Sequence, residues 1–476
     1  MSFTSIWFPF FLIFSVFVYY IIPTKYSFIW LATASLVSCA LFDVYWGVIT
    51  IILCLFSYYW GILLETVKQK KALLIVGILV SSTTLLTFKF SKSLIAPIGI
   101  SYYILRIIAY LVSVYNGKIQ AHKCIVKYFL FVSFFPMLSQ GPIERPDRFF
   151  SQIESRKTFD FEQLKSGIML IIWGYALKFI AADRLSIFVN SVYLDISSSS
   201  GSVLAIAALL YSLQLYCDFS ACTCIALGSA EMFGIKLTDN FNAPFLSSSI
   251  TELWRNWHIT LTDWLREYIY FPLGGSRKGT YRKYLNIIIV FLVSGLWHGN
   301  GFGFLIWGFI NGLYQVAESS TLCIRKKINS KLSINESSPI FKLLCSIRVF
   351  LLFSLSFIFF RLPDVKDSWL VISRIFTLAV SDDNLSVFQY GVSAKAFILL
   401  AVFVILLFIA DISKRKKQSI RSFILRKHDL IQVLVISLSI TAILIFGIYG
   451  AGFDASGFIK RTFIIILFFY ASIFSF

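Results

Sequence analysis

Two histidines in an apolar, Trp-rich stretch are the residues of this chain best suited to chemistry. His258 and His298 lie between Glu252 and Gly299, in ELWRNWHITLTDWLREYIYFPLGGSRKG and then RKYLNIIIVFLVSGLWHG. Ionisable groups are costly to desolvate in membrane-like sequence, so they usually mark a site or a pathway. Imidazole is also the side chain whose pKa suits proton transfer near neutrality. The pattern therefore predicts acid–base chemistry inside a membrane.

The elements that must position these histidines are predicted to be membrane helices. The chain has 476 residues, of which 58% are hydrophobic, 18% aromatic and only 14% charged. Apolar runs recur along nearly the whole length, which favours one polytopic domain over residues 1–476 rather than a string of soluble ones. A full crossing needs about 20 apolar residues, and several of the runs are shorter. We therefore expect an all-α membrane protein with about ten to thirteen membrane helices, the last of them over Thr462–Phe476.

The net charge of +19 does not indicate nucleic acid, because the positive residues sit in short loops between apolar runs. The densest run extends from Lys414 to Lys417, and others lie at residues 68–71, 118–127, 277–283 and 325–327. The positive-inside rule makes such loops cytoplasmic and places the N-terminus outside. The same loops can also dock an acidic partner or an anionic donor. The eight cysteines show no CxxC spacing, so we expect no metal site.

Six sequence blocks stand out, with the core motifs over residues 97–362. They are PIGISYYILRIIAYLVSVYNG from Pro97, FFPMLSQGPIERPDRF from Phe134, LQLYCDFSACTCIALGSAEMFGIKLTDNFNAPF from Leu213, SITELWRNWHITLTDWLREYIYFPLGGSRKG from Ser249, GLWHGNGFGFLIWGFINGLY from Gly295 and FIFFRLPD from Phe357. In this order they resemble the membrane-bound O-acyltransferase family, specifically its bacterial branch of alginate O-acetylases and D-alanyl transferases of teichoic acid. The resemblance covers most of the chain.

The resemblance implies a ring of membrane helices around a thinned central channel, with funnels entering from both faces. It places His298, which matches the family's invariant WHG histidine, where donor and acceptor meet. Acyl transfer from a thioester to a hydroxyl needs a base for the hydroxyl proton, and His298 is our candidate for it. His258 matches the family's second histidine. It can orient the donor, polarise the thioester carbonyl, hold the first histidine's surroundings in place, or serve packing alone.

Seven residues around the histidines form the predicted substrate-binding group: Trp254, Arg255, Trp257, Arg266, Asp218, Trp297 and Asn300. At helical spacing Trp254, His258 and Thr262 share one face. The two arginines can contact donor phosphates, or they can pair with Glu252 and Glu267. The remaining histidines, His122 and His428, sit in basic loops and are expected to be solvated.

Asp218 matches a carboxylate of the family, and it either contributes to the acceptor funnel or bonds to a neighbouring helix. The family pattern continues Ser-Gly-Tyr-Ser-Asp, whereas this chain reads SACTC over residues 220–224. If the missing second carboxylate shapes the acceptor funnel in relatives, acceptor choice differs here. The C-terminus also departs from the family, because Lys460, Arg461 and a further apolar segment follow the Gly447–Gly457 loop.

We therefore expect a multi-pass enzyme of the cell membrane that moves an acetyl group from cytoplasmic acetyl-CoA to a hydroxyl. The acceptor is a surface or secreted polysaccharide, or a relay protein outside the membrane. The chain shows no recognisable soluble catalytic domain, which predicts a separate extracytoplasmic acetyltransferase or relay protein as a partner, besides membrane lipid. No bound cofactor is expected.

Two alternatives stay open. The first is transfer of a D-alanyl or other acyl group from an acyl carrier protein to a cell-wall polymer. The second is a transporter or channel whose path His298 lines. Transporters commonly carry inverted repeats, and we see none in this sequence.

Overall fold

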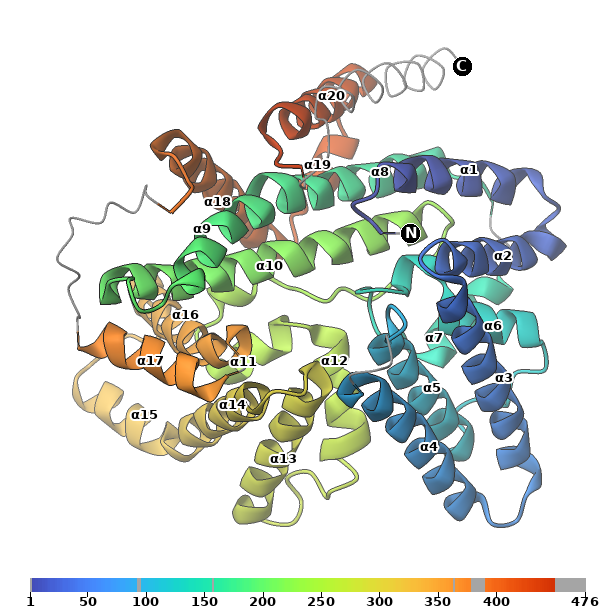
Figure 1. Cartoon of the computed structure of the whole chain (residues 1–476), viewed down its shortest axis with the longest axis horizontal. Coiled ribbons are helices and arrows are strands. Elements are labelled where there is room, and N and C mark those ends of the chain that lie inside the picture. Colours follow the sequence, from blue (N-terminus) through green and yellow to red (C-terminus); the bar gives the residue numbers. More distant parts are fainter. Residues whose placement is uncertain (1, 92–95, 156–157, 363, 378–389, 450–476) are drawn as a thin grey trace.

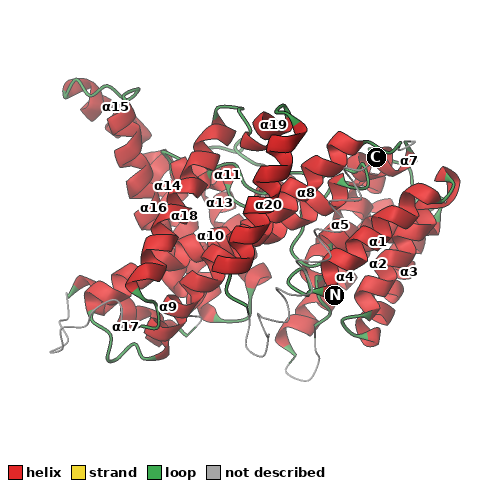
Figure 2. Ribbon diagram, turned by 90° about the horizontal axis from the view of Figure 1, so that it is seen from above, coloured by secondary structure: helices red, strands yellow, loops and turns green. Residues whose placement is uncertain are grey.

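The protein is built from helices (Figures 1 and 2). The computed structural model describes residues 2–91, 96–155, 158–362, 364–377 and 390–449, and these ranges contain no β-strand. The α-helices are α1 Trp7–Ile21, α2 Ser27–Ala40, α3 Val44–Thr66, α4 Lys70–Phe90, α5 Ile100–Tyr115, α6 Ile125–Ser133, α7 Pro146–Glu154, α8 Phe161–Ala176, α9 Asp183–Leu194, α10 Gly201–Glu231, α11 Ile250–Asn256, α12 Ile259–Leu265, α13 Thr280–His298, α14 Phe302–Ser320, α15 Leu322–Lys331, α16 Pro339–Arg361, α17 Val365–Phe376, α18 Ala394–Arg415, α19 Ile420–Leu425 and α20 Asp429–Phe446. Two π-helical segments, η3 Leu177–Ala182 and η5 Arg266–Tyr270, follow α8 and α12.

Seven helical segments in the described ranges are long and apolar enough to cross a membrane. They are α3, α4, the continuous α8–η3–α9 unit, α10, α16, α18 and α20. The all-helical membrane architecture is thus confirmed. The count of ten to thirteen membrane helices and the ring around a central channel are not, and they stay predictions. The predicted span Thr462–Phe476 lies outside the described residues.

Helices α8 and α10 form the most extensive helix pair and run side by side across the molecule (Figure 1). Their backbones approach closely through small residues. A Cβ atom on Gly167 would lie 2.7 Å from the carbonyl oxygen of Gly228, and one on Gly174 would lie 2.8 Å from that of Ala221. Small residues at the contact are typical of membrane helix pairs, which lack a hydrophobic driving force between them. Helix α10 is therefore held as a fixed axis of the fold.

Two aromatic-rich cores lie along α10, one at each end of the helix. The first is formed by α1–α7, the C-terminal part of α10 and α12, and Tyr110 and Phe131 are fully buried in it. The second is formed by α9, the N-terminal part of α10, α11, α14 and α16–α18, and Trp307 and Phe353 are buried there. Helix α11 belongs to the second core and α12 to the first. The junction between α11 and α12 therefore lies where the two cores meet.

Two of the basic loops predicted to be cytoplasmic, at residues 118–127 and 414–417, take part in polar contacts with other loops. The bonds that join them are Lys118–Glu267 (2.6 Å), Arg145–Glu267 (2.9 Å), Arg148–Thr238 (2.8 Å) and Lys414–Asp239 (3.4 Å). They link the loop after α5, the start of α7, the loop after α10, the η5 segment and the end of α18. Segments from separate parts of the sequence therefore lie together, and the side of the membrane on which they lie stays a prediction.

Candidate active site

The helix breaks between α11 and α12, and His258 occupies the break. α11 ends at Asn256, α12 begins at Ile259, and His258 has a left-handed backbone with φ 45° and ψ 53°. The prediction that Trp254, His258 and Thr262 share one helical face is therefore wrong. A left-handed backbone is uncommon for a residue other than glycine, and such strain costs roughly 1–3 kcal/mol. The surroundings must hold this turn in place.

A buried asparagine from the loop after α10 holds the turn. The backbone carbonyl of Asn240 accepts a hydrogen bond from the Ile259 N–H at 2.9 Å. Its side-chain Oδ1 accepts from the backbone N–H of Thr260 at 3.3 Å and from Thr260 Oγ1 at 2.6 Å. Thr260 Oγ1 in turn accepts from the Ile143 N–H at 3.0 Å. Asn240 thus satisfies the first N–H groups of α12, which the His258 side chain does not cap.

The His258 imidazole is enclosed by aromatic rings. It is 3% exposed, and its ring centroid lies 4.6 Å from that of Phe219, 6.0 Å from Trp297 and 6.4 Å from Tyr102. Neither ring nitrogen has a hydrogen-bond partner among the described residues. Burial without a charged partner disfavours the protonated form of an imidazole, so the ring is neutral at pH 7. Because buried polar atoms are almost always bonded in native proteins, the unpaired nitrogens indicate a place for an incoming polar group.

His298 is the last residue of α13 and is also held by aromatic packing. Its ring centroid lies 4.8 Å from Trp297, 5.1 Å from Trp307 and 5.0 Å from Phe360. The side chain is partly exposed, unlike that of His258. Within the described part of the chain no hydrogen bond engages its nitrogens, so they are available to a substrate.

Trp297 lies between the two histidines and contacts both rings. Its indole Nε1–H donates to the Ser101 carbonyl at 3.2 Å, and its ring meets that of Tyr102 edge-on at 5.5 Å. The Lys89 ammonium lies 5.2 Å from the indole centroid. Residues of α4, α5 and α13 therefore fix the indole, and the structure brings the two predicted catalytic histidines to one place.

The predicted substrate-binding tryptophans of α11 occupy the packed core. Trp254 and Trp257 are 7% and 4% exposed. Trp254 packs against Phe291 and Trp257 against Phe353, with ring centroids 5.2 and 4.9 Å apart. Both side chains therefore pack in the core next to the break between α11 and α12 and stabilise it. Their predicted contact with substrate remains untested.

The two predicted arginines lie at the surface, and neither forms the expected ion pair. Glu252 pairs with Arg415 at 2.9 Å, and Glu267 pairs with the loop residues named above. Arg266 instead bonds to Asp263 at 2.8 Å. Arg255 is exposed and has no ion pair within the described ranges. Both guanidinium groups thus remain accessible to an anionic ligand.

Asn300, which was predicted to bind substrate, and His122, which was predicted to be solvated, lie in different surroundings. Asn300 is exposed, and its Nδ2 lies 3.5 Å from the Lys89 carbonyl. His122 was expected in a solvated loop, but its side chain is only 11% exposed because it packs on Phe150 and bonds to Glu154 at 3.2 Å. Sequence spacing gives no sign of such packing.

Asp218 forms an ion pair with a lysine of the neighbouring helix. Lys178 Nζ lies 2.6 Å from Asp218 Oδ1 and 2.9 Å from Asp183 Oδ1. Lys178 belongs to the π-helical segment η3, and such segments occur frequently at functional sites. The next residue along α10, Phe219, packs on His258. The carboxylate thus lies close to the histidine site.

Several residues of the site escape analysis of the sequence alone. Tyr102 and Phe219 surround His258, and Asn240 with Thr260 holds its backbone. The motif blocks contain all four of them, but only the fold shows which members of a block meet. Asn240 follows Thr238 and Asp239 in a polar loop, so nothing in the sequence directs attention to it.

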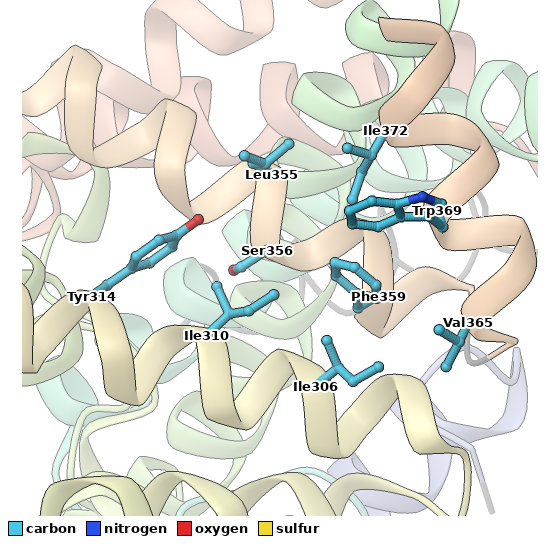
Figure 3. A pocket seen from close by; sticks show the side chains of 9 residues that line it. All are labelled: Ile306, Ile310, Tyr314, Leu355, Ser356, Phe359, Val365, Trp369 and Ile372. Carbon is cyan, nitrogen blue, oxygen red and sulfur yellow. The ribbon is translucent and has the colours of Figure 1, made fainter. Parts of the chain in front are cut away.

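A cavity of about 340 Å³ opens between α14, α16 and α17 (Figure 3). Its lining is almost entirely apolar: Ile306, Ile310, Tyr314, Leu355, Ser356, Phe359, Val365, Trp369 and Ile372. The Ser356 hydroxyl already bonds to Asn311 and to the Phe353 carbonyl. The cavity therefore offers no charged group for the phosphates of a nucleotide donor. Two of its lining helices, α14 and α16, also contact His298 through Trp307 and Phe360.

Comparison with known proteins follows the same blocks. The model of the membrane-bound O-acyltransferase family matches residues 6–360. The chain is 32% identical over 316 residues to a probable alginate O-acetylase of Pseudomonas aeruginosa, covering 65% of this chain and 58% of that protein. It is 31% identical over 301 residues to a peptidoglycan O-acetyltransferase of Helicobacter pylori (58% of this chain, 56% of that protein). It is 28% identical over 229 residues to a teichoic acid D-alanyltransferase of Bacillus subtilis (45% of this chain, 57% of that protein).

The chain thus spans less than two thirds of the length of each of these relatives. Because the family model covers most of the chain, with both histidine blocks inside it, this chain belongs to the membrane-bound O-acyltransferase family.

Proposed function

We propose that the chain is a membrane O-acyltransferase that moves an acetyl group from cytoplasmic acetyl-CoA to a hydroxyl on the extracytoplasmic side. The observation that carries this proposal is the meeting of two histidines on one indole in the interior of a helical membrane protein. His258 and His298 both contact Trp297, and the described residues leave the nitrogens of both rings unbonded. Acyl transfer needs a base and a hydrogen-bond donor at one reacting centre, and this pair can supply both.

In the proposed reaction His298 accepts the proton of the acceptor hydroxyl while the hydroxyl oxygen bonds to the acetyl carbonyl carbon. The carbon–sulfur bond of the thioester then breaks. CoA leaves as a thiolate, which takes the proton from His298 and restores the neutral ring. His258 is neutral and carries one N–H, so it can donate to the carbonyl oxygen, where negative charge develops. A donor of this kind contributes on the order of 10²–10³ in rate.

The donor is proposed to approach from the basic face. Its phosphates would be attracted by the clustered positive loops and contacted by Arg255 and Arg266, which stay accessible. The teichoic acid relative supports a second candidate, D-alanyl transfer from an acyl carrier protein. That donor is also a thioester, so the same proton transfers serve it. We favour acetyl because the two O-acetyltransferases are more similar to the chain.

The acceptor is proposed to be a surface polysaccharide, or the hydroxyl of an extracytoplasmic relay protein that completes the reaction. The names of the alginate and peptidoglycan relatives support a polymer. A membrane interior has little surface for gripping a long polymer, which supports the relay partner. The proposal places the enzyme in the cell membrane. It also includes the ring of ten to thirteen helices, with shorter apolar helices such as α1, α5 and α6 counted among them.

Radiolabelled acetyl-CoA tests the proposal directly. The purified chain in proteoliposomes should transfer label to an alginate or peptidoglycan oligosaccharide, or release it slowly to water when no acceptor is present. His298→Ala should abolish both, whereas His428→Ala, at an exposed loop position, should abolish neither. Absence of any acetyl-CoA-dependent activity in the unmodified chain, with and without a cell-envelope extract that supplies a relay protein, would overturn the acetyl proposal. Activity with D-alanyl carrier protein in its place would establish the second candidate.

A further inference from the structure

We infer that a polar strip on α10 binds the sugar hydroxyl groups of a saccharide acceptor and leads them to the histidines. The strip, called here the α10 strip, consists of Tyr211, Gln214 and Asp218, with Lys178 and Arg361 beside it. The inference rests on the proposed function, because it names the acceptor class for the same site.

The three α10 residues lie on one side of the helix. Their spacing of three and four residues places Tyr211, Gln214 and Asp218 one above the other on a single face. The Ser-rich loop Ser197–Ser200, which precedes the Gly201 end of α10, is predicted from the sequence to lie outside. Tyr211 is nearest that end, and Asp218 is furthest from it. The strip therefore runs from the predicted outer side toward the middle of the fold.

The deep end carries three charges inside two membrane-spanning segments. Lys178 bridges Asp218 and Asp183 at 2.6 and 2.9 Å. These side chains keep 23%, 35% and 28% exposure, so the cluster is not sealed by packing among the described residues. Charged groups at membrane depth are costly and face a polar cavity or pathway. A pathway for a polar molecule is thus indicated at this end.

The middle and the outer end of the strip offer further polar groups. The Gln214 Oε1 atom is buried, and no described residue bonds to it. The Arg361 guanidinium lies 6.0 Å from the Tyr211 ring centroid and 5.7 Å from that of Tyr193, and it donates to Asn190 Oδ1 at 2.9 Å. Because buried polar atoms normally have partners, the Gln214 amide is positioned to receive one from a ligand.

The two ends of the strip are each next in sequence to a residue that packs on one of the histidines. Asp218 precedes Phe219, whose ring packs at 4.6 Å on His258. Arg361 follows Phe360, whose ring packs at 5.0 Å on His298. The strip therefore runs close to the residues that surround both histidines, on a neighbouring side of α10 and α16.

The chemistry of the strip matches a saccharide. Sugar hydroxyls both donate and accept hydrogen bonds, and the strip has a carboxylate that accepts, an ammonium that donates and an amide that does both. No group of three or more metal-ligating side chains occurs in the described ranges, so the carboxylates are not accounted for by a metal site there.

The test compares acceptor and donor kinetics in proteoliposomes, with alginate hexasaccharide and peptidoglycan oligosaccharides as the saccharide probes. Gln214→Leu breaks no bond seen in the structure, so its folding is expected to be normal. It should raise the acceptor KM about three- to tenfold, and Lys178→Met should raise it about tenfold or more. The KM for acetyl-CoA should stay within about twofold. Gln163→Leu, the same substitution at the cytoplasmic end of α8, is the matched control and should change neither constant.

The outcomes separate the two proposals. If the unmodified chain shows no acetyl-CoA-dependent activity, the proposed function fails. If it is active but Gln214→Leu and Lys178→Met leave the saccharide KM unchanged, the strip is not the acceptor path. If the variants impair only transfer to a serine-containing relay peptide and not to saccharide, the assignment of the acceptor class is overturned.

Discussion

The substitution Thr260→Val tests whether the turn at His258 is a working part of the site. Thr260 is 5% exposed, and its hydroxyl donates to Asn240 Oδ1 at 2.6 Å and accepts from the Ile143 N–H at 3.0 Å. Valine keeps the shape and removes both bonds. The lost bond contributes about 1 kcal/mol, and leaving the Ile143 N–H buried and unpaired costs about 1–3 kcal/mol more.

This loss is comparable with the strain that the turn must withstand. A left-handed histidine costs roughly 1–3 kcal/mol, so a loss of about 2–4 kcal/mol lets the backbone leave that conformation. If the whole of this free energy is added to the activation barrier of the reaction, kcat falls by a factor of about 30 to about 900. The melting temperature should fall by only a few degrees, because the change is small for a chain of this size.

The assay is label transfer from acetyl-CoA in proteoliposomes, with thermal unfolding measured on the same preparation. Thr251→Val serves as the matched control, because it lies in the adjacent α11 and its hydroxyl makes no hydrogen bond to a described residue. Unchanged kcat in Thr260→Val would refute the reasoning. So would an equal loss of activity in Thr251→Val, because general softening of α11 and α12 would then explain the effect.

Three further substitutions or fusions follow from the same structure. His298→Ala should lower acyl transfer by about 10²–10⁴-fold, since it removes a positioned base. Normal membrane insertion and a normal melting temperature would show that the loss is chemical, whereas near-normal product in cells would exclude His298 as the base. His258→Ala should impair turnover less completely; unchanged turnover with unchanged donor affinity would leave it a packing residue. Reporters fused after Lys71, Arg282 and Lys417 should all score cytoplasmic, and an external signal at Lys417 would contradict the orientation of the last third of the chain.

The histidine pair could be predicted from the sequence, and the reason is chemical. His258 and His298 are rare polar groups among apolar and aromatic residues, so their cost of burial makes them visible without a structure. The all-helical membrane fold was equally visible, because continuous apolar runs have few other solutions. Both predictions depend on composition and not on how distant residues meet.

The local geometry could not be predicted in the same way. The sequence from Trp254 to Thr262 suits a helix, and no proline or glycine marks a break there. The break is imposed by Asn240, which lies outside that stretch and replaces the side-chain cap of α12. The Lys178–Asp218 pair is hidden for the same reason, because the partners are on different helices. Tertiary contacts decide such features, and a single sequence does not reveal them.

The break at His258 treats the polar groups of the main chain and of the side chain differently. Backbone that leaves the helix at membrane depth is tolerated only where protein buries it or where it lines a cavity. Here the backbone bonds around His258 are taken up by Asn240, whereas the imidazole nitrogens are left to no described residue. The polar groups of the main chain are therefore hydrogen-bonded within the protein, whereas the imidazole nitrogens remain free to bond to another molecule. Because α11 is packed in one core and α12 in the other, the unpaired group lies at the boundary between them.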